Sequence, residues 1–186
     1  MQQYLFIRWV TMKKKVLAII ISSTILILLM GLFLVPFRTA LVFHVQNTEQ
    51  IQAFLPIDEE EPFQIIFTHS IHLTDVVEKY KVRDDHQIVQ TEITYEEFGI
   101  GMPSNAEEGE EFVYEDGKYH IRELNNVFSS MNVRNGKTVS KNRLAWGENG
   151  EKMVWFNEYF TPGDWYNVRV EKLTLWQYMK GMKINE

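Results

Sequence analysis

The stretch Phe63–Tyr95, FQIIFTHSIHLTDVVEKYKVRDDHQIVQTEITY, contains three apolar runs rich in β-branched residues. The runs cover Phe63–His69, Val76–Val82 and Gln87–Tyr95, and the third alternates in part between apolar and polar residues, as a strand does. Only the short polar segment Asp84–His86 separates the second run from the third. We therefore predict three neighbouring strands, of which the last two form a β-hairpin.

Strand signals continue outward on both sides of this stretch. Ala40–Gln46 is a further apolar run before it, and Trp165–Leu175 is the last, although Leu173–Met182 is also compatible with a short terminal helix. Three dipeptides tolerate the positive φ of tight hairpin turns: Asp116-Gly117, Asn135-Gly136 and Asn149-Gly150. About nine or ten short strands with regular turns predict an all-β domain, either an antiparallel β-sandwich or a partly open barrel.

Each of the three dipeptides lies between short apolar segments that are the expected arms of its hairpin. The arms are Glu111–Tyr114 and Lys118–Ile121 for the first, Val133 and Val139 for the second, and Leu144–Trp146 and Met153–Phe156 for the third.

The segment Val16–Val35, VLAIIISSTILILLMGLFLV, has no charged residue. A helix of this length spans about 30 Å, the thickness of the hydrocarbon core of a bilayer. Lys13–Lys15 precede it directly, and Pro36 is expected to end it because proline cannot continue helical hydrogen bonding. Basic residues flanking such a helix stay in the cytoplasm, so the domain that follows is expected outside.

Three regions result from this pattern. We expect a basic cytoplasmic N-terminus over 1–15, a transmembrane signal-anchor helix over 16–36, and an extracytoplasmic β-rich domain over 40–186. The protein is thus expected in the cell membrane as a single-pass protein, and its first partner is the membrane itself.

A cleaved secretory signal is the alternative to an anchor. Such a signal has an apolar region of about 7–15 residues that ends in small residues at the cleavage site. Here the apolar run is longer. Cleavage after Ala40 or after Gly31 would also require a small residue two positions earlier, where the chain has Arg38 and Leu29. The sequence favours an uncleaved anchor and leaves the starting methionine open between Met1 and Met12.

Charge and cysteine content exclude several function classes. Residues 1–38 carry five basic residues and no acidic one, whereas the rest carries 14 basic and 25 acidic residues, a net charge of −11. A domain this acidic repels nucleic-acid backbones, so we expect no nucleic-acid partner. The chain has no cysteine, which excludes disulfides, thiolate nucleophiles, cysteine-ligated metal centres and a lipidated cysteine.

Two short motifs contain the candidate site residues. The first runs from the end of one expected strand into the next and holds two histidines, hydroxyl groups and an acid; its candidates are His69, Ser70, Thr74 and Glu78. The second follows the third strand, and its glycines allow close backbone approaches; its candidates are Gly99, Gly101 and Pro103. We treat these seven residues as ligand-binding or partner-binding candidates.

The order of the two motifs resembles a bacterial exported family, domain of unknown function 1850 (DUF1850), whose pattern is H-S-V-x-x-T-P-V-x-E followed by G-A-G-L-P. The resemblance covers about residues 41–144, with Asp75 in place of the usual proline and Met102 in place of the usual leucine. Family members are often encoded beside TRAP-type transporters, which use a separate solute-binding protein. The resemblance therefore implies an accessory role in transport, with a transporter subunit or solute-binding protein as partner.

Physical reasoning leaves three roles open for His69. It can brace its own turn by bonding backbone groups, or bind a small anion or metabolite with Ser70 and Glu78. The third role is acyl-transfer catalysis, which is disfavoured because neighbouring residues of a strand point to opposite faces, so Ser70 and its base do not meet easily. His69 and His72 likewise fall on opposite faces of a strand, which argues against zinc.

We thus expect a non-catalytic accessory to a TRAP-type transporter, with no catalytic residue, no metal and no cofactor. The alternatives are a small-molecule-binding or hydrolytic enzyme that uses His69 and Glu78, and a structural envelope protein. Most C-terminal aromatic residues are expected in the core, although two or three of them are candidates for an exposed docking or membrane-interface surface. These aromatic residues are Trp146, Trp155, Phe156, Tyr159, Phe160, Trp165, Tyr166, Trp176 and Tyr178.

Overall fold

A computed structural model describes residues 1–99, 101–139 and 141–185, without the side chains of residues 2–11. The chain divides into two compact units. The first combines Met1–Phe37 with Leu173–Met179, and the second combines Arg38–Lys172 with Lys180–Glu186.

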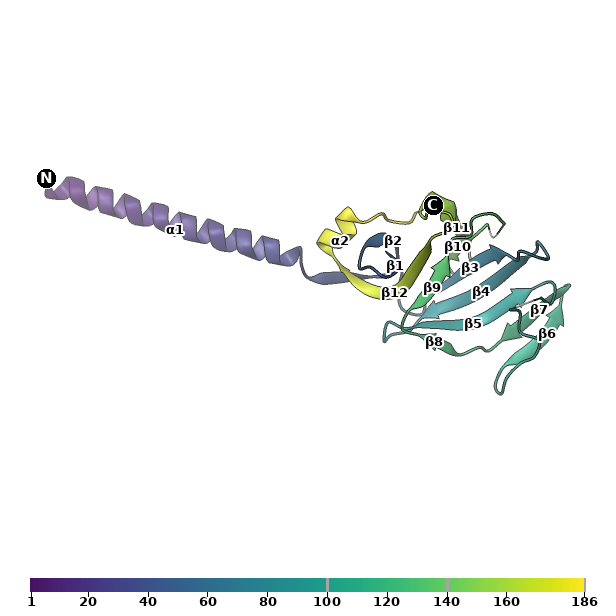
Figure 1. Ribbon diagram of the computed structural model, residues 1–186. Coiled ribbons are helices and arrows are strands. Elements are labelled where there is room, and N and C mark those ends of the chain that lie inside the picture. The colour runs from purple at the N-terminus through teal and green to yellow at the C-terminus, as the bar shows by residue number, and fades with distance from the viewer. Residues whose placement is uncertain (100, 140, 186) are drawn as a thin grey trace. The chain divides into compact units, whose positions relative to one another are not determined.

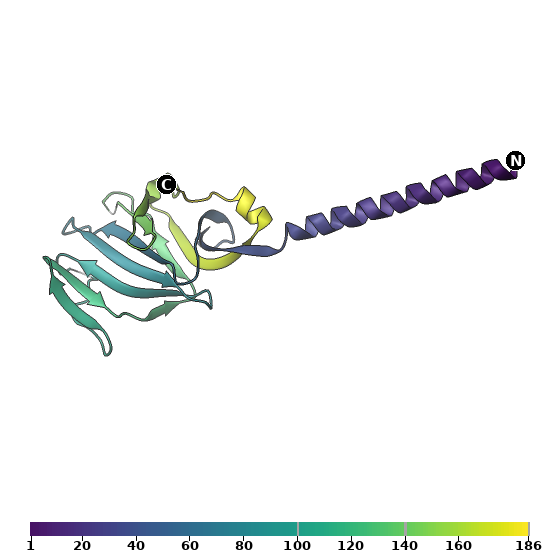
Figure 2. The same ribbon diagram turned by 180° about the vertical axis from the view of Figure 1, so that it is seen from behind.

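The first unit is built on the long helix α1, Gln2–Leu32, which is continuous in both views (Figures 1 and 2). Its part Met12–Leu32 comprises 21 residues with a mean hydropathy of 2.4, and none of it is buried in the protein. It is therefore long and apolar enough to cross a membrane.

The sequence pattern placed the end of the apolar helix at Pro36. In the structure α1 ends at Leu32, four residues earlier. Pro36 is instead the first residue of the strand β1. In a continuing helix, the proline ring would clash with the carbonyl group of Leu32, four residues earlier, so the effect of Pro36 begins before the proline itself. The expected short terminal helix is present as α2, Leu175–Lys180.

The second unit contains two mostly antiparallel β-sheets packed as a sandwich, which confirms the predicted fold class (Figure 1). One sheet has the strand order β2-β1-β12-β9; the other has the order β11-β10-β3-β4-β5-β7-β6, with β8 also paired to β5. The described residues form twelve strands and one 3₁₀ turn, η1 (Phe156–Glu158). The strands are β1 (Pro36–Val45), β2 (Ile51–Pro56), β3 (Pro62–Thr68), β4 (Asp75–Val82), β5 (Ile88–Tyr95), β6 (Glu111–Glu115), β7 (Lys118–Arg122), β8 (Asn126–Phe128), β9 (Met131–Arg134), β10 (Arg143–Trp146), β11 (Lys152–Trp155) and β12 (Trp165–Thr174).

Two of the three predicted hairpin turns are confirmed. Asp116 and Gly117 both have positive φ and join β6 to β7, and Asn149-Gly150 lies between the paired strands β10 and β11. The third prediction is wrong, because β9 pairs with β12 and not with a strand around Val139. Asn135 is instead buried, and its side-chain amide donates to the carbonyl oxygen of Phe160 at 2.8 Å.

Two hydrophobic clusters cover the inner face of the larger sheet. The main cluster lies between the two sheets and includes Phe43, Phe63 and Val168. The smaller one includes Val76, Tyr95 and Ile121, and the half-buried side chain of Met102 packs against it.

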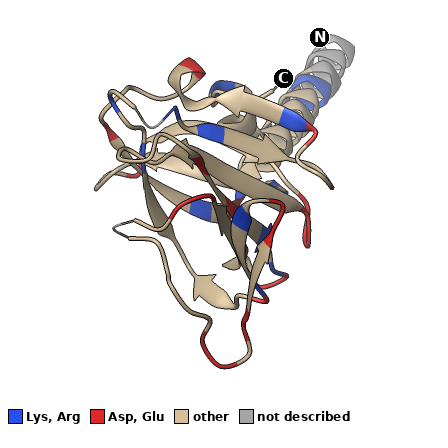
Figure 3. Cartoon of the chain, turned by 90° about the vertical axis from the view of Figure 1, so that its right-hand side faces the viewer, with Lys and Arg blue, Asp and Glu red and all other residues tan. Residues whose placement is uncertain are grey.

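Acidic residues of this unit lie mainly on loops and strand ends (Figure 3). The loop between β5 and β6 alone contains five glutamates, Glu96, Glu97, Glu107, Glu108 and Glu110. The excess negative charge therefore lies largely on solvated turns.

Candidate ligand-binding cleft

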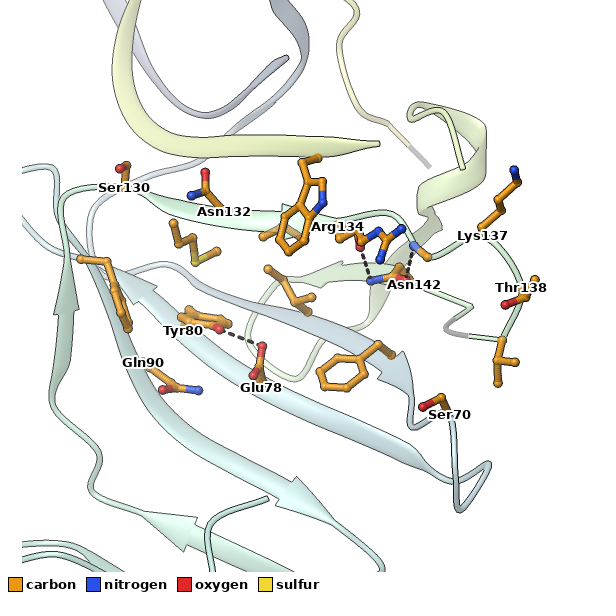
Figure 4. Close-up of a pocket in the computed structure, with 18 residues that line it drawn as sticks. Ser70, Glu78, Tyr80, Gln90, Ser130, Asn132, Arg134, Lys137, Thr138 and Asn142 are labelled. Carbon is orange, nitrogen blue, oxygen red and sulfur yellow. Dashed lines mark hydrogen bonds between the residues drawn. The ribbon is translucent and has the colours of Figure 1, made fainter. Parts of the chain in front are cut away.

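A cleft of about 830 Å³ opens within the sandwich unit (Figure 4). Strands β3, β4, β5 and β8 supply one wall, and β9 with the loop that follows it supplies the other. Its apolar lining includes Ile65, Phe67, Phe128, Met131, Val133, Val139 and Trp165. Its polar lining is Ser70, Glu78, Tyr80, Gln90, Ser130, Asn132, Arg134, Lys137, Thr138 and Asn142.

Glu78 is the one acidic residue of this lining. Across the sheet it is opposite Ile65 of β3 on one side and Ile93 of β5 on the other. Directly opposed residues of antiparallel strands share a face, so the carboxyl group stands in an otherwise aliphatic row. That row faces the interior, where Ile65 and Ile93 are buried.

The Glu78 carboxylate accepts a hydrogen bond from the Tyr80 hydroxyl at 2.9 Å, drawn as a dashed line in Figure 4. Burial raises the pKa of Glu78 and outweighs the opposing effect of the bond from Tyr80. Burial and the adjacent carboxylate also raise the pKa of Tyr80, so its hydroxyl stays protonated as a donor. A carboxylate with a single donor keeps acceptor capacity for a ligand.

The opposite wall carries two basic side chains. The Arg134 guanidinium lies 5.8 Å from the centre of the Trp165 ring, and its Nε donates to the Gly163 carbonyl oxygen at 3.3 Å. Asn142 holds the loop in place, because its amide donates to the carbonyl oxygen of Arg134 and its Oδ1 accepts from the Gly136 N–H, both at 3.2 Å (Figure 4). Lys137, in the same loop, is exposed.

His69 lies in the turn between β3 and β4 and not in the lining of the cleft. Its Nδ1 accepts long hydrogen bonds, 3.4 Å each, from the backbone N–H groups of Ile71 and His72. Its own backbone N–H donates to the carbonyl oxygen of Thr74 at 2.8 Å. The imidazole therefore braces the turn, and the same nitrogen is not available as a base for Ser70.

The second motif packs directly on the first. The His69 and His72 rings stack with centroids 5.1 Å apart, and His72 Nδ1 lies 2.8 Å from a Glu97 carboxylate oxygen. A β-carbon at Gly99 would lie only 2.8 Å from His72 Nε2 and 3.0 Å from His69 Cε1, so this close approach requires glycine.

The rest of the second motif fixes the loop that leaves β5. Gly101 has a φ of +89°, a conformation that favours glycine. The Tyr95 hydroxyl donates to the carbonyl oxygen of Pro103. The seven candidates thus separate into two neighbouring groups: Ser70 and Glu78 line the cleft, whereas the other five build the brace next to it.

The family comparison covers most of this arrangement, but not Trp165. Residues 63–153 match the family model described as domain of unknown function (DUF1850). The resemblance inferred from the two motifs is confirmed, and the matched part runs from β3 to β11. No curated protein and no solved structure shows significant similarity to the chain.

The DUF1850 match includes cleft residues that the motifs did not identify. Tyr80 lies two residues after Glu78, and strand alternation was a usable signal for placing it on the same face. Arg134, Lys137 and Asn142 gave no such signal, because they reach the cleft only through the pairing of β9 with β12. The expected hairpin at Asn135 obscured that pairing.

Proposed function

We propose that the sandwich unit binds a small organic solute in this cleft without transforming it. In the same proposal, the domain stands on the outer face of the membrane and acts as an accessory to a TRAP-type transporter. The solute is a largely apolar molecule that presents an ammonium or another N–H donor to Glu78.

The observation that carries the proposal is the Glu78 carboxyl within the aliphatic row between Ile65 and Ile93. Its charged form loses hydration by burial, and the Tyr80 hydroxyl alone does not offset that loss. An apolar residue at this position would stabilise the sheet more. A ligand that donates to the carboxylate supplies the missing interaction.

The dimensions and lining support the same solute class. Small-molecule sites commonly measure about 300–1,000 Å³ and combine apolar walls with a few converging polar groups. The cleft, at about 830 Å³, falls within that range and has apolar walls from both sheets. His69 and Gly99 keep its end rigid, which favours a preformed site.

The membrane part of the proposal rests on α1 and its charges. Met12–Leu32 is long and apolar enough to span a bilayer, and Lys13–Lys15 at its start favour a cytoplasmic N-terminus. A solute-binding domain held at the outer membrane surface suits delivery to a transporter in the same membrane. The TRAP type is proposed from the family resemblance.

Thermal unfolding of the purified full chain with three six-carbon probes tests the binding step. The probes are n-hexylammonium, n-hexanol and hexanoate. We expect n-hexylammonium at ten times its Kd to stabilise the domain by about 1.4 kcal/mol, and Glu78→Gln to abolish the effect. Glu92→Gln is the matched control, because Glu92 lies outside the cleft lining and is already bonded to Lys79. Equal stabilisation of wild type and Glu78→Gln, or none by any probe, would refute the proposed site.

The transporter step has its own test. Crosslinking in native membranes, followed by purification of the full chain, is expected to recover a transporter subunit or its solute-binding protein. Recovery of abundant membrane proteins alone would contradict the accessory role while leaving the binding result intact.

A further inference from the structure

In the first unit, the chain returns from the end of β12 to the end of the membrane helix. The backbone N–H of Trp176 in α2 donates to the carbonyl oxygen of Phe33, just after α1, at 3.2 Å. The ring of Tyr178 packs against that of Phe37 edge to face, with centroids 5.6 Å apart. Two segments far apart in the sequence therefore meet where the apolar helix ends.

The surface formed there is apolar and open. Leu34 is 70% exposed, Phe37 54%, Trp176 51% and Met179 67%. Large apolar side chains that gather at one place indicate a contact surface. This surface directly follows the part of α1 that is apolar enough to span a bilayer. We therefore take the bilayer as its partner.

The length of the helix sets the depth of this surface. Met12–Leu32, with 21 residues, is about 31 Å long and fills the hydrocarbon core. Phe33–Phe37 and the α2 residues bonded to them then lie at the level of the headgroups. Trp and Tyr are enriched at that level, because their rings are apolar and their N–H or O–H groups are polar.

We propose that α2 is a membrane-interface helix. Trp176, Tyr178 and Met179 insert beside Leu34 and Phe37 into the outer headgroup region and form an aromatic belt around the exit of α1. A helix of six residues is too short to be stable alone in water, so its contacts with Phe33 and Phe37 help to hold it. This inference is independent of the solute cleft.

The natural absence of cysteine makes a direct test clean. Single-cysteine variants Leu34→Cys, Met179→Cys and Met153→Cys of the full chain carry a nitroxide label in phospholipid vesicles. Met153 is the matched control, since it is an exposed methionine on β11 of the sandwich unit. We expect labels at positions 34 and 179 to contact dissolved oxygen several-fold more than a water-soluble nickel complex, and the label at 153 to show the reverse preference.

Equal nickel access at positions 179 and 153 would overturn the proposal. That result would assign the α2 surface to water, or to a protein partner that these vesicles do not contain. Water-like access at position 34 as well would also overturn it, because α1 would then not be inserted. Unchanged melting temperatures of the three labelled variants exclude unfolding as the cause of any difference.

Discussion

At the scale of single residues, Glu78 combines a cost in stability with a position suited to binding. Burial raises its pKa in the folded domain above the unfolded value. Folding therefore favours the protonated carboxyl, and stability falls as the pH rises from the unfolded pKa through the raised one. Glu92, on the same sheet, behaves oppositely: burial acts to raise its pKa, but hydrogen bonds from Lys79 and His120 lower it overall.

Glu78→Gln is accordingly expected to raise the melting temperature at pH 7.5 and to change it less at pH 4.5. Glutamine keeps the shape and can accept the bond from Tyr80, but it carries no charge to desolvate. Each kcal/mol of removed cost corresponds to about 2–4 °C. Glu92→Gln should lower the melting temperature at pH 7.5, because it removes the partner of Lys79. A drop for Glu78→Gln at pH 7.5 would show that its charge is already compensated in the free protein.

Gly99 supports a second prediction at this scale. A β-carbon there would meet the imidazoles of His72 and His69 at 2.8 and 3.0 Å, so Gly99→Ala is expected to cost about 1–3 kcal/mol of unfolding free energy. Chemical denaturation measures this loss.

A double-mutant cycle with His72→Ala identifies its origin. If the close contact causes the loss, Gly99→Ala should cost clearly less in the His72→Ala background, with a coupling of about 0.5–3 kcal/mol. Strictly additive effects would mean that the loss comes from the backbone of the loop and not from the imidazole pair.

At the scale of elements, the sequence predicted strands well wherever local turn chemistry and side-chain alternation agreed. β3, β4 and β5 were predicted within about one residue, and the hairpin at Asp116-Gly117 has the positive φ values that the dipeptide favours. The hairpin prediction at Asn135-Gly136 was wrong, because a buried hydrogen-bonding position can favour asparagine as strongly as a tight turn does. The strand β2 escaped prediction, since Ile51–Pro56 is short and has no turn dipeptide beside it.

The contrast between the two Asn-Gly dipeptides gives the next prediction. Asn135→Ala removes the donor to the buried carbonyl oxygen of Phe160, and this unpaired group should cost about 1–3 kcal/mol. Asn149→Ala changes an exposed side chain of the β10–β11 turn and should stay within about 0.5 kcal/mol. Urea unfolding of both variants gives the comparison. Similar losses at the two positions would contradict the interior role of Asn135.

At the scale of the whole molecule, the sequence predicted the apolar helix and the β fold, but it identified residues from only one wall of the cleft. The motif with Glu78 is one short segment that can be recognised in the sequence. Arg134 and Asn142, in contrast, reach the cleft from a distant segment through sheet pairing. Such a site depends on which strands lie opposite each other across the sandwich. Hydrophobic alternation specifies a face of each strand and not its partner in the other sheet.

The orientation of the chain across the membrane is the last prediction, and cysteine accessibility tests it on the intact molecule. Lys14→Cys lies in the basic segment before the apolar run, and Met153→Cys lies on the exposed surface of β11. Since basic flanks remain cytoplasmic, a membrane-impermeant maleimide should label position 153 in cells whose outer layers are permeable to it, and position 14 only after lysis. Both variants should stay in the membrane fraction after alkaline carbonate washing, because a helix that spans the bilayer is not released by high pH. Labelling of position 14 in intact cells would reverse the proposed orientation, and a soluble product that begins near Thr39 would replace the anchor with a cleaved signal.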